Sequence, residues 1–113
     1  MSTRLEATSV ETHLSAEQLG HLHRLLQDEQ AMQQARALEL EDAPDLEPDL
    51  AEALLVRCQE ALEEVEAALR LFDQGLYGLC AGCGAAIRFE RLEAVPAARH
   101  CVSCQADRDR DMR

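Results

Sequence analysis

Residues 75–84 read Gly75-Leu-Tyr-Gly-Leu-Cys80-Ala-Gly-Cys83-Gly84, and residues 101–105 read Cys101-Val-Ser-Cys104-Gln105. Two Cys-x-x-Cys pairs therefore stand on either side of a 17-residue spacer, residues 84–100. Each pair lies on a tight turn that directs two sulfurs to one point, and the spacer lets the second turn fold back over the first. This spacing is typical of a metal site that four thiolates share.

The four thiolates favour Zn²⁺ as the metal, and the expected ligands are Cys80, Cys83, Cys101 and Cys104. A closed tetrahedral site leaves no open position for water, so we expect no hydrolytic chemistry and no enzyme. A redox-active Cys-x-x-Cys and an iron–sulfur centre are the alternatives. Zinc is favoured because the chain lacks a thioredoxin-like βαβ pattern and because the two pairs match the spacing of a zinc ribbon.

The composition favours an elongated helical protein over a compact globule. The 113 residues include two Phe, one Tyr and no Trp, which is little bulk for the core of a globule. With 22 acidic and 11 basic residues, the formal net charge is −11. A polyanion has no electrostatic footprint for duplex DNA or for an anionic membrane, so we expect no direct DNA binding and no membrane association.

The sequence also favours the cytoplasm. No apolar run approaches the ~20 residues that span a bilayer, and the N-terminus lacks the basic-then-apolar pattern of a signal peptide. Five cysteines, four of them in pairs, fit metal binding in a reducing compartment better than a disulfide framework.

The segment before the cysteines predicts two long helices. Ser15 and Gln18 form a capping box, which places the first helix at residues 16–41. Its apolar stripe is Leu19, Leu22, Leu25, Leu26, Met32, Ala35 and Leu38. The second helix is expected at residues 49–74, and steps of three and four residues give it a heptad seam. That seam is Ala51, Leu54, Cys58, Leu62, Val65, Leu69 and Phe72.

We expect these helices to form an antiparallel two-helix coiled coil, and the fold class to be mainly α. Pro44 and Pro48 force a turn, so the hairpin tip falls at residues 42–49. Helices of this length put the tip ~40 Å from the zinc site. The expected organisation is a loose segment 1–14, a hairpin 15–74, and a zinc-finger module 75–113 with a short terminal helix, in a monomeric chain. Within that module, residues 85–92 are expected to form an extended pair or a turn.

The hairpin tip is strongly acidic. Six acids and no base lie between residues 39 and 49: Glu39, Glu41, Asp42, Asp45, Glu47 and Asp49. In one interpretation, Asp45 or Asp49 caps the second helix and the other acids solvate a loop. In the other, the cluster reaches a basic pocket or a bound Mg²⁺ in a partner. The residues alone leave both open.

A longer pattern surrounds the cysteines: Gly75-x-Tyr77-Gly78-x-Cys80-x-x-Cys83-Gly84, Ile87, Arg91-Leu92-Glu93-Ala94-x-Pro96 and Cys101-x-x-Cys104-Gln105. Together with the preceding hairpin, this pattern resembles the DksA/TraR zinc-finger family over residues 15–110. The resemblance implies a transcription regulator that binds RNA polymerase rather than DNA. It also implies that the coiled coil enters the secondary channel, so that acids at its tip approach the active site.

The tip motif implied by the family is Asp-x-x-Asp-x-Ala. Asp49-Leu50-Ala51 matches its second half, whereas Leu46 stands where the first Asp belongs and Asp45 is displaced by one residue. The candidate partner-binding residues of the tip are therefore Asp45, Asp49 and Ala51.

The resemblance implies that family members that respond to the alarmone ppGpp bind it through basic residues. Three of the corresponding positions here are Glu64, Val95 and Gln105, and Arg57 is the only basic residue retained. Because a polyphosphate needs Lys or Arg, we expect no direct contribution to ppGpp binding. Two other functions stay open. One is a zinc-ribbon adaptor that docks a non-polymerase protein through its coiled coil, and the other is a thiol redox protein.

Overall fold

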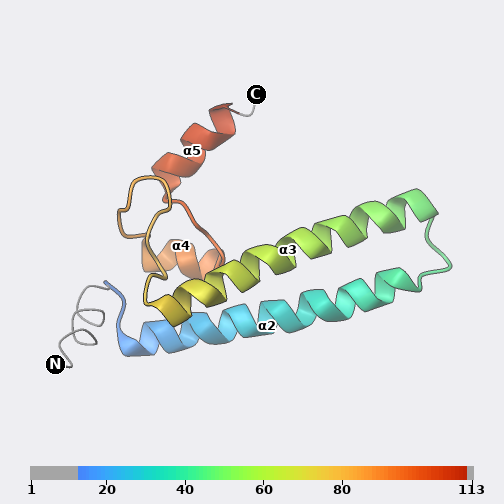
Figure 1. Cartoon of the computed structure of the whole chain (residues 1–113), viewed down its shortest axis with the longest axis horizontal. Helices are drawn as coiled ribbons and strands as arrows, with labels where there is room; N and C mark the ends of the chain where they lie inside the picture. The colour runs from blue at the N-terminus through green and yellow to red at the C-terminus, as the bar shows by residue number, and fades with distance from the viewer. Residues whose placement is uncertain (1–12, 112–113) are drawn as a thin grey trace.

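The computed structural model describes residues 13–111, and two long antiparallel helices dominate it (Figure 1). Helices α2 (Ala16–Glu41) and α3 (Pro48–Gln74) form a hairpin, and the shorter α4 (Phe89–Ala94) and α5 (Val102–Asp111) follow. The molecule measures 57 × 33 × 22 Å, which is the elongated shape that the composition predicts. The mainly α fold class is confirmed. The expectations for residues 1–12 and 112–113 lie outside the described residues, and the division into three parts and the monomeric state stay predictions.

Local signals in the sequence set the helix ends. The Ser15 hydroxyl accepts a hydrogen bond from the Gln18 N–H, and the Gln18 side chain accepts one from the Ser15 N–H, both at 3.0 Å. This capping box starts α2 at Ala16, as predicted. Helix α3 begins one residue earlier than predicted, with Pro48 at its first position. It ends at Gln74, and the C-cap residue Gly75 has a left-handed φ of 74°, which suits glycine.

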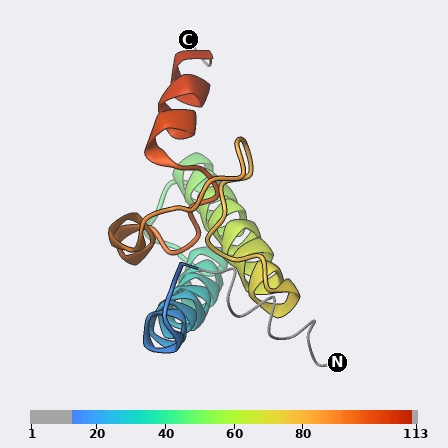
Figure 2. The same cartoon turned by 90° about the vertical axis from the view of Figure 1, so that its left-hand side faces the viewer.

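The buried core lies at the base of the hairpin, where the cysteine region folds back over the helices. It consists of Leu14, Leu22, Leu26, Val65, Ala68, Tyr77, Cys80, Ile87 and Leu92. Helix α4 packs beside α2 at this end, whereas α5 projects away from the hairpin (Figure 2). The hairpin and the cysteine region therefore share one core.

The predicted apolar stripe of α2 is wrong in the half nearer the tip. Met32 is 48 % exposed, Leu38 is 67 % exposed, and Ala35 is also exposed. At 3.6 residues per turn, the face that contains Leu22 and Leu26 continues through other positions. These half-buried positions are Glu29, Gln33, Ala37 and Leu40. Between the distal halves of the helices the interface is therefore more polar than the sequence predicts.

The α3 seam follows the prediction more closely. Cys58 and Val65 are buried, and the other five seam residues are half-buried. Cys58 is the buried residue nearest the tip among the described residues, and Leu54 and Ala51, one and two turns nearer the tip, are only half-buried. Apolar packing thus weakens from the base of the hairpin to its tip.

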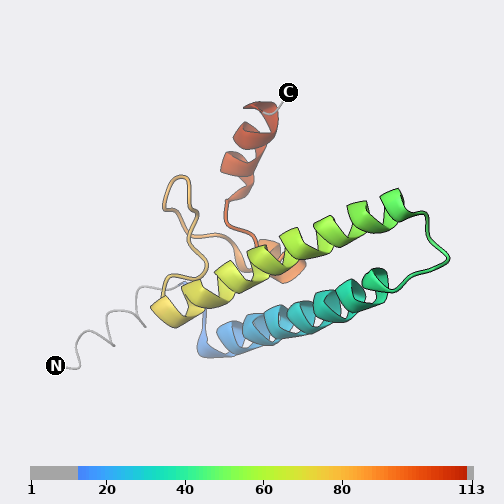
Figure 3. The same cartoon turned by 45° about the vertical axis from the view of Figure 1, so that its right-hand side comes forward.

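The prediction of an extended pair or turn at residues 85–92 is right for its first part alone. Ala86 forms an isolated antiparallel bridge with Leu79. From Phe89 onward the chain is helical, because α4 buries Leu92 in the basal core while Phe89 packs against that core. Figure 3 shows α4, in orange, behind α3. Within residues 13–111, no helix combines the length and the apolarity of a membrane span.

Candidate metal centre

The four cysteines that the sequence predicts as metal ligands lie close together. The Sγ atoms of Cys80, Cys83, Cys101 and Cys104 all lie within 4.8 Å of one another. The Cys83 and Cys101 sulfurs are 3.9 Å apart, and a tetrahedral zinc with bonds of about 2.3 Å holds its sulfurs about 3.8 Å apart. The separation is also far too long for a disulfide. The geometry fits a metal ion better than a covalent cross-link.

The first cysteine pair is held by a tight turn. The Cys80 N–H donates to the Ala85 carbonyl at 2.8 Å, and the Gly84 N–H donates to the Cys80 carbonyl at 2.9 Å. The Gly82 N–H points at the Cys80 sulfur, 3.3 Å away. A Cβ at Gly82 would lie 3.2 Å from the Cys104 sulfur, so a larger residue would push the two pairs apart.

Hydrogen bonds from the spacer place the second pair over the first. The Ala81 N–H donates to the Arg99 carbonyl at 2.7 Å, and the Arg91 Nε donates to the His100 carbonyl at 2.9 Å. Cys104 then lies in the first turn of α5. Sequence reasoning missed this positioning role of Arg91, whose one signal was its place in the longer pattern around the cysteines.

The protonation of the cluster favours a cation. Hydrogen bonds from the backbone N–H groups of Cys101 and Cys83 lower the pKa of the Cys80 thiol to about 5. The hydrogen bond between Cys104 and the Cys80 sulfur raises the pKa of Cys104 to about 12. Four thiolates this close together repel one another, and a divalent cation offsets part of their negative charge.

The donor set selects among metals. All four donors are sulfurs, and no other group of three or more His, Cys, Asp or Glu side chains in residues 13–111 is placed to hold an ion. Four thiolates at tetrahedral separation suit zinc and leave no position for a reactive water. The site can therefore stabilise a fold but offers no Lewis-acid chemistry.

Side chains from the hairpin base fasten this module to the helices. The Tyr77 hydroxyl donates to the Pro96 carbonyl at 2.8 Å, and its ring stacks on Phe72 at 4.1 Å. His21 Nε2 lies 3.1 Å from the Glu93 carboxylate, and this contact joins α2 to α4. His13 Nε2 contacts the Ile87 carbonyl at 2.5 Å. Sequence reasoning missed the two histidines because neither lies on an apolar stripe or in a motif.

The candidate tip residues lie at the opposite end of the molecule. Asp45 is exposed in the loop between the helices, Asp49 is exposed in the first turn of α3, and Ala51 is half-buried one turn on. The N-cap of α3 is Glu47, which makes no side-chain capping bond, so the interpretation of Asp45 or Asp49 as the cap is wrong. The carboxylates of the tip face solvent.

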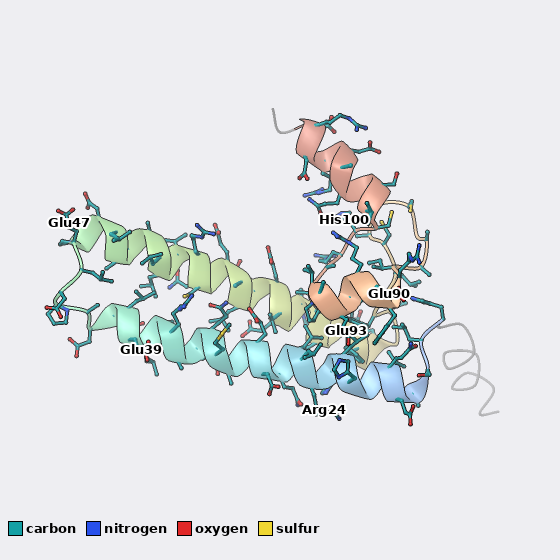
Figure 4. All side chains as sticks on the ribbon, turned by 180° about the vertical axis from the view of Figure 1, so that it is seen from behind. Arg24, Glu39, Glu47, Glu90, Glu93 and His100 are labelled. Atoms are coloured by element: carbon teal, nitrogen blue, oxygen red, sulfur yellow. The ribbon has the colours of Figure 1, made fainter. Side chains whose placement is uncertain are left out.

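The structure keeps the tip and the cysteines apart, as expected. Glu47 and Glu39 lie toward the tip of the hairpin, whereas Glu93 and His100 lie in the module that covers the base half (Figure 4). The 27 residues of α3 span about 40 Å between these ends. The molecule presents a metal-stabilised base and a remote acidic tip.

Comparison with known proteins identifies the cysteine module. Residues 75–110 match the prokaryotic dksA/traR C4-type zinc finger family. The match contains all four clustered cysteines and the first nine residues of α5. The convergent sulfurs and this C4-type match together identify zinc as the metal.

Two curated relatives match over part of their length. General stress protein 16O of Bacillus subtilis (strain 168) is 50 % identical over 54 residues, which are 48 % of this chain and 33 % of that protein. An uncharacterized protein of Aquifex aeolicus (strain VF5) is 38 % identical over 50 residues, which are 44 % of this chain and 34 % of that protein. The matched region thus spans about a third of each relative.

A solved structure matches the whole arrangement of hairpin and module. Transcription factor DksA2 from Pseudomonas aeruginosa superposes with a TM-score of 0.73 at 26 % sequence identity. The match covers 88 % of this chain and 89 % of that one. The likeness therefore includes the long hairpin, which the family match over residues 75–110 does not reach.

Proposed function

We propose, because the chain belongs to the DksA/TraR zinc-finger family, that it is a transcription regulator that binds RNA polymerase. One observation supports this most: an exposed acidic tip lies at the far end of a hairpin whose base is fixed by a sulfur cluster. A polyanion of net charge −11 reaches nucleic acid more readily through a protein partner than by direct contact. The proposed setting is the cytoplasm, and the proposed role is regulatory, with no catalysis by this chain.

The proposed zinc ligands are Cys80, Cys83, Cys101 and Cys104. In this role zinc holds two turns together and takes no part in a reaction. Cys80 belongs to both the sulfur cluster and the basal core, so the bound metal also fixes the direction in which the hairpin leaves the module.

The hairpin is proposed to enter the secondary channel of the polymerase and to bring Asp45, Asp49 and Ala51 toward the active site. The tip carboxylates make no ion pair within the described residues and are free to meet cations in the partner. Long-range attraction between an acidic rod and a basic channel speeds association and weakens as salt is added.

We also propose that this chain makes no direct contribution to ppGpp binding. Glu64, Val95 and Gln105 line one cavity and offer no cation of their own. The same cavity is also lined by arginines, namely Arg91, Arg99 and Arg108. Because arginines can bind a polyphosphate, a binding measurement can contradict the proposal. Saturable ppGpp binding that requires both this protein and the polymerase would do so.

The tip is tested by a double substitution, Asp45→Asn with Asp49→Asn. Both side chains are exposed, so zinc content and thermal unfolding should stay unchanged, while the effect on transcription by purified polymerase should be lost. The matched control, Glu63→Gln with Asp73→Asn, removes the same charge from exposed positions on α3 outside the tip.

Two outcomes would contradict the proposal. No association of the unaltered protein with polymerase at low salt would exclude the partner. Full activity of the tip variant, with loss of activity on disrupting the Leu54/Leu62/Leu69 seam, would favour the adaptor function instead.

A further inference from the structure

A small cavity lies where the cysteine module meets the hairpin, and we call it the junction notch. Its floor is Leu26, Ala61 and Val65, its wall is residues 94–97, and its rim carries the carboxylates of Glu29 and Glu64. Helices α2 and α3 each supply one side, and the end of α4 with the segment after it supplies the third. The notch is therefore formed by the assembly of the two parts of the molecule.

The floor of the notch is apolar, and hydrogen bonds hold its wall in place. Leu26 is 0 % exposed and Val65 is 2 % exposed, so the floor belongs to the basal core. The wall is held by the hydrogen bond from the Ala98 N–H to the Val95 carbonyl, 2.9 Å, and by the Tyr77 hydroxyl bound to Pro96. Val95 is nevertheless 46 % exposed, which leaves an uncovered apolar side chain at the opening.

The rim is negatively charged. Glu64 is exposed on α3, and Glu29 faces it from α2 while accepting a 2.9 Å hydrogen bond from the Gln33 side chain. Within residues 13–111, no arginine forms an ion pair with either carboxylate. Two acids thus flank an apolar floor without a cation between them.

Size decides which class of ligand fits. The cavity volume is about 190 Å³. Pockets for cofactors and drug-sized ligands have about 300–1,000 Å³, so this notch is too small for them. A single side chain fits better. Arginine and lysine combine an aliphatic stem for the floor with a cationic head for the rim.

We propose that the junction notch receives one arginine or lysine side chain from the protein partner. The inference rests on the proposed function, in which that partner is RNA polymerase. Contact at the notch would lock the base of the rod to the polymerase while the tip acts elsewhere. A basic residue on the partner would then set the depth to which the hairpin enters.

The first experiment needs no partner. The zinc-loaded protein is titrated with N-acetylargininamide and followed by NMR, with the neutral N-acetylleucinamide as the comparison probe. We expect saturable shifts at Leu26, Ala61, Val65 and Val95 with the arginine probe. The double variant Glu29→Gln with Glu64→Gln should weaken binding about tenfold, since it removes both carboxylates that pair with the guanidinium.

A matched control removes the same charge elsewhere. Glu60 and Glu63 are exposed on α3 and do not line the notch, so replacing both with Gln should leave the arginine titration unchanged. Three results would overturn the proposal: shifts spread evenly over the acidic surface, equal shifts with the leucine probe, or equal weakening in both double variants.

The second experiment separates this inference from the proposed function. Affinity for RNA polymerase is compared for the unaltered protein and the two double variants. A loss of affinity restricted to the Glu29/Glu64 variant supports the notch. Equal affinity of all three refutes the notch and leaves the polymerase as partner, whereas no affinity of the unaltered protein refutes the proposed function itself.

Discussion

Tyr77 is the residue that joins the cysteine module to the hairpin most directly. Its ring stacks on Phe72 at the end of α3, and its hydroxyl donates to the carbonyl of Pro96 in the spacer. It is also a member of the basal core. Because burial disfavours the phenolate, it raises the pKa of Tyr77 above its usual value.

This shift predicts a loss of stability in alkali. The unfolded chain ionises its tyrosine near pH 10, whereas the folded chain keeps the phenol neutral to higher pH. The contribution of the neutral Tyr77 phenol to the free energy of unfolding is therefore complete below about pH 10, and it is lost as the pH rises toward the pKa of the folded state. Urea unfolding across this range should show the decline, and tyrosinate absorbance reports Tyr77 alone because the chain has one Tyr.

The matched variant is Tyr77→Phe, which keeps the ring and removes the hydroxyl. It should cost about 0.5–1.5 kcal/mol at neutral pH through the lost hydrogen bond. It should also abolish the decline near pH 10. An identical decline in the variant would show that another group causes it.

At the scale of single residues, the sequence predicts the metal ligands better than it predicts the residues whose hydrogen bonds position those ligands. The spacing of the cysteines identifies all four members of the sulfur cluster, because ligand spacing is a local property. The supporting contacts of Arg91 and His13 go to backbone carbonyls that lie 9 and 74 residues away in the chain. A backbone acceptor leaves no mark in a sequence, so these contacts could not be predicted.

At the scale of elements, α2 consists of two unlike halves. The half near the base buries Leu22 and Leu26, and the half near the tip presents Glu29 and Gln33 to α3. The start of this helix could be predicted because a capping box is local, and its end could be predicted because Pro44 follows shortly after it. Its inward face could not, because the apolar residues Met32 and Leu38 shift the apparent stripe away from the face that packs.

The two halves should respond differently to truncation. Leu26→Ala opens a cavity in the basal core and should cost about 2–5 kcal/mol. Met32→Ala, in the same helix, removes a side chain that is 48 % exposed and lies outside the core, and should change stability by less than about 0.5 kcal/mol. Urea unfolding of both variants measures the difference. Equal losses of stability in the two variants would mean that Met32 packs in the interface, as the sequence predicted, and would contradict the structure.

At the scale of the whole molecule, one core serves both the hairpin base and the zinc module. Cys80 is a member of the core and of the sulfur cluster, so loss of the metal should disturb both parts. The two parts could be predicted separately from local patterns. Their shared core and the junction notch could not, because they depend on how the spacer folds back over α2 and α3.

Removal of zinc by a chelator should therefore expose amides at the base of the hairpin as well as in the module. Hydrogen exchange should speed up at Leu22, Val65 and Ile87, and readdition of zinc should reverse it. Cys83→Ser should mimic the chelator and lower zinc content, whereas Cys58→Ala, outside the sulfur cluster, should keep stoichiometric zinc. Unchanged exchange at the base would mean that the core holds without the metal.

The central claim is that the acidic tip reaches the polymerase active site while the zinc module stays outside. Photo-crosslinking tests it most directly, with the reactive residue placed at Glu47, an exposed position whose side chain makes no capping bond, or at Arg110 in α5. We expect crosslinks from position 47 to the channel beside the active site, and none there from position 110. Crosslinks from position 47 that map only to the outer surface of the polymerase would contradict it.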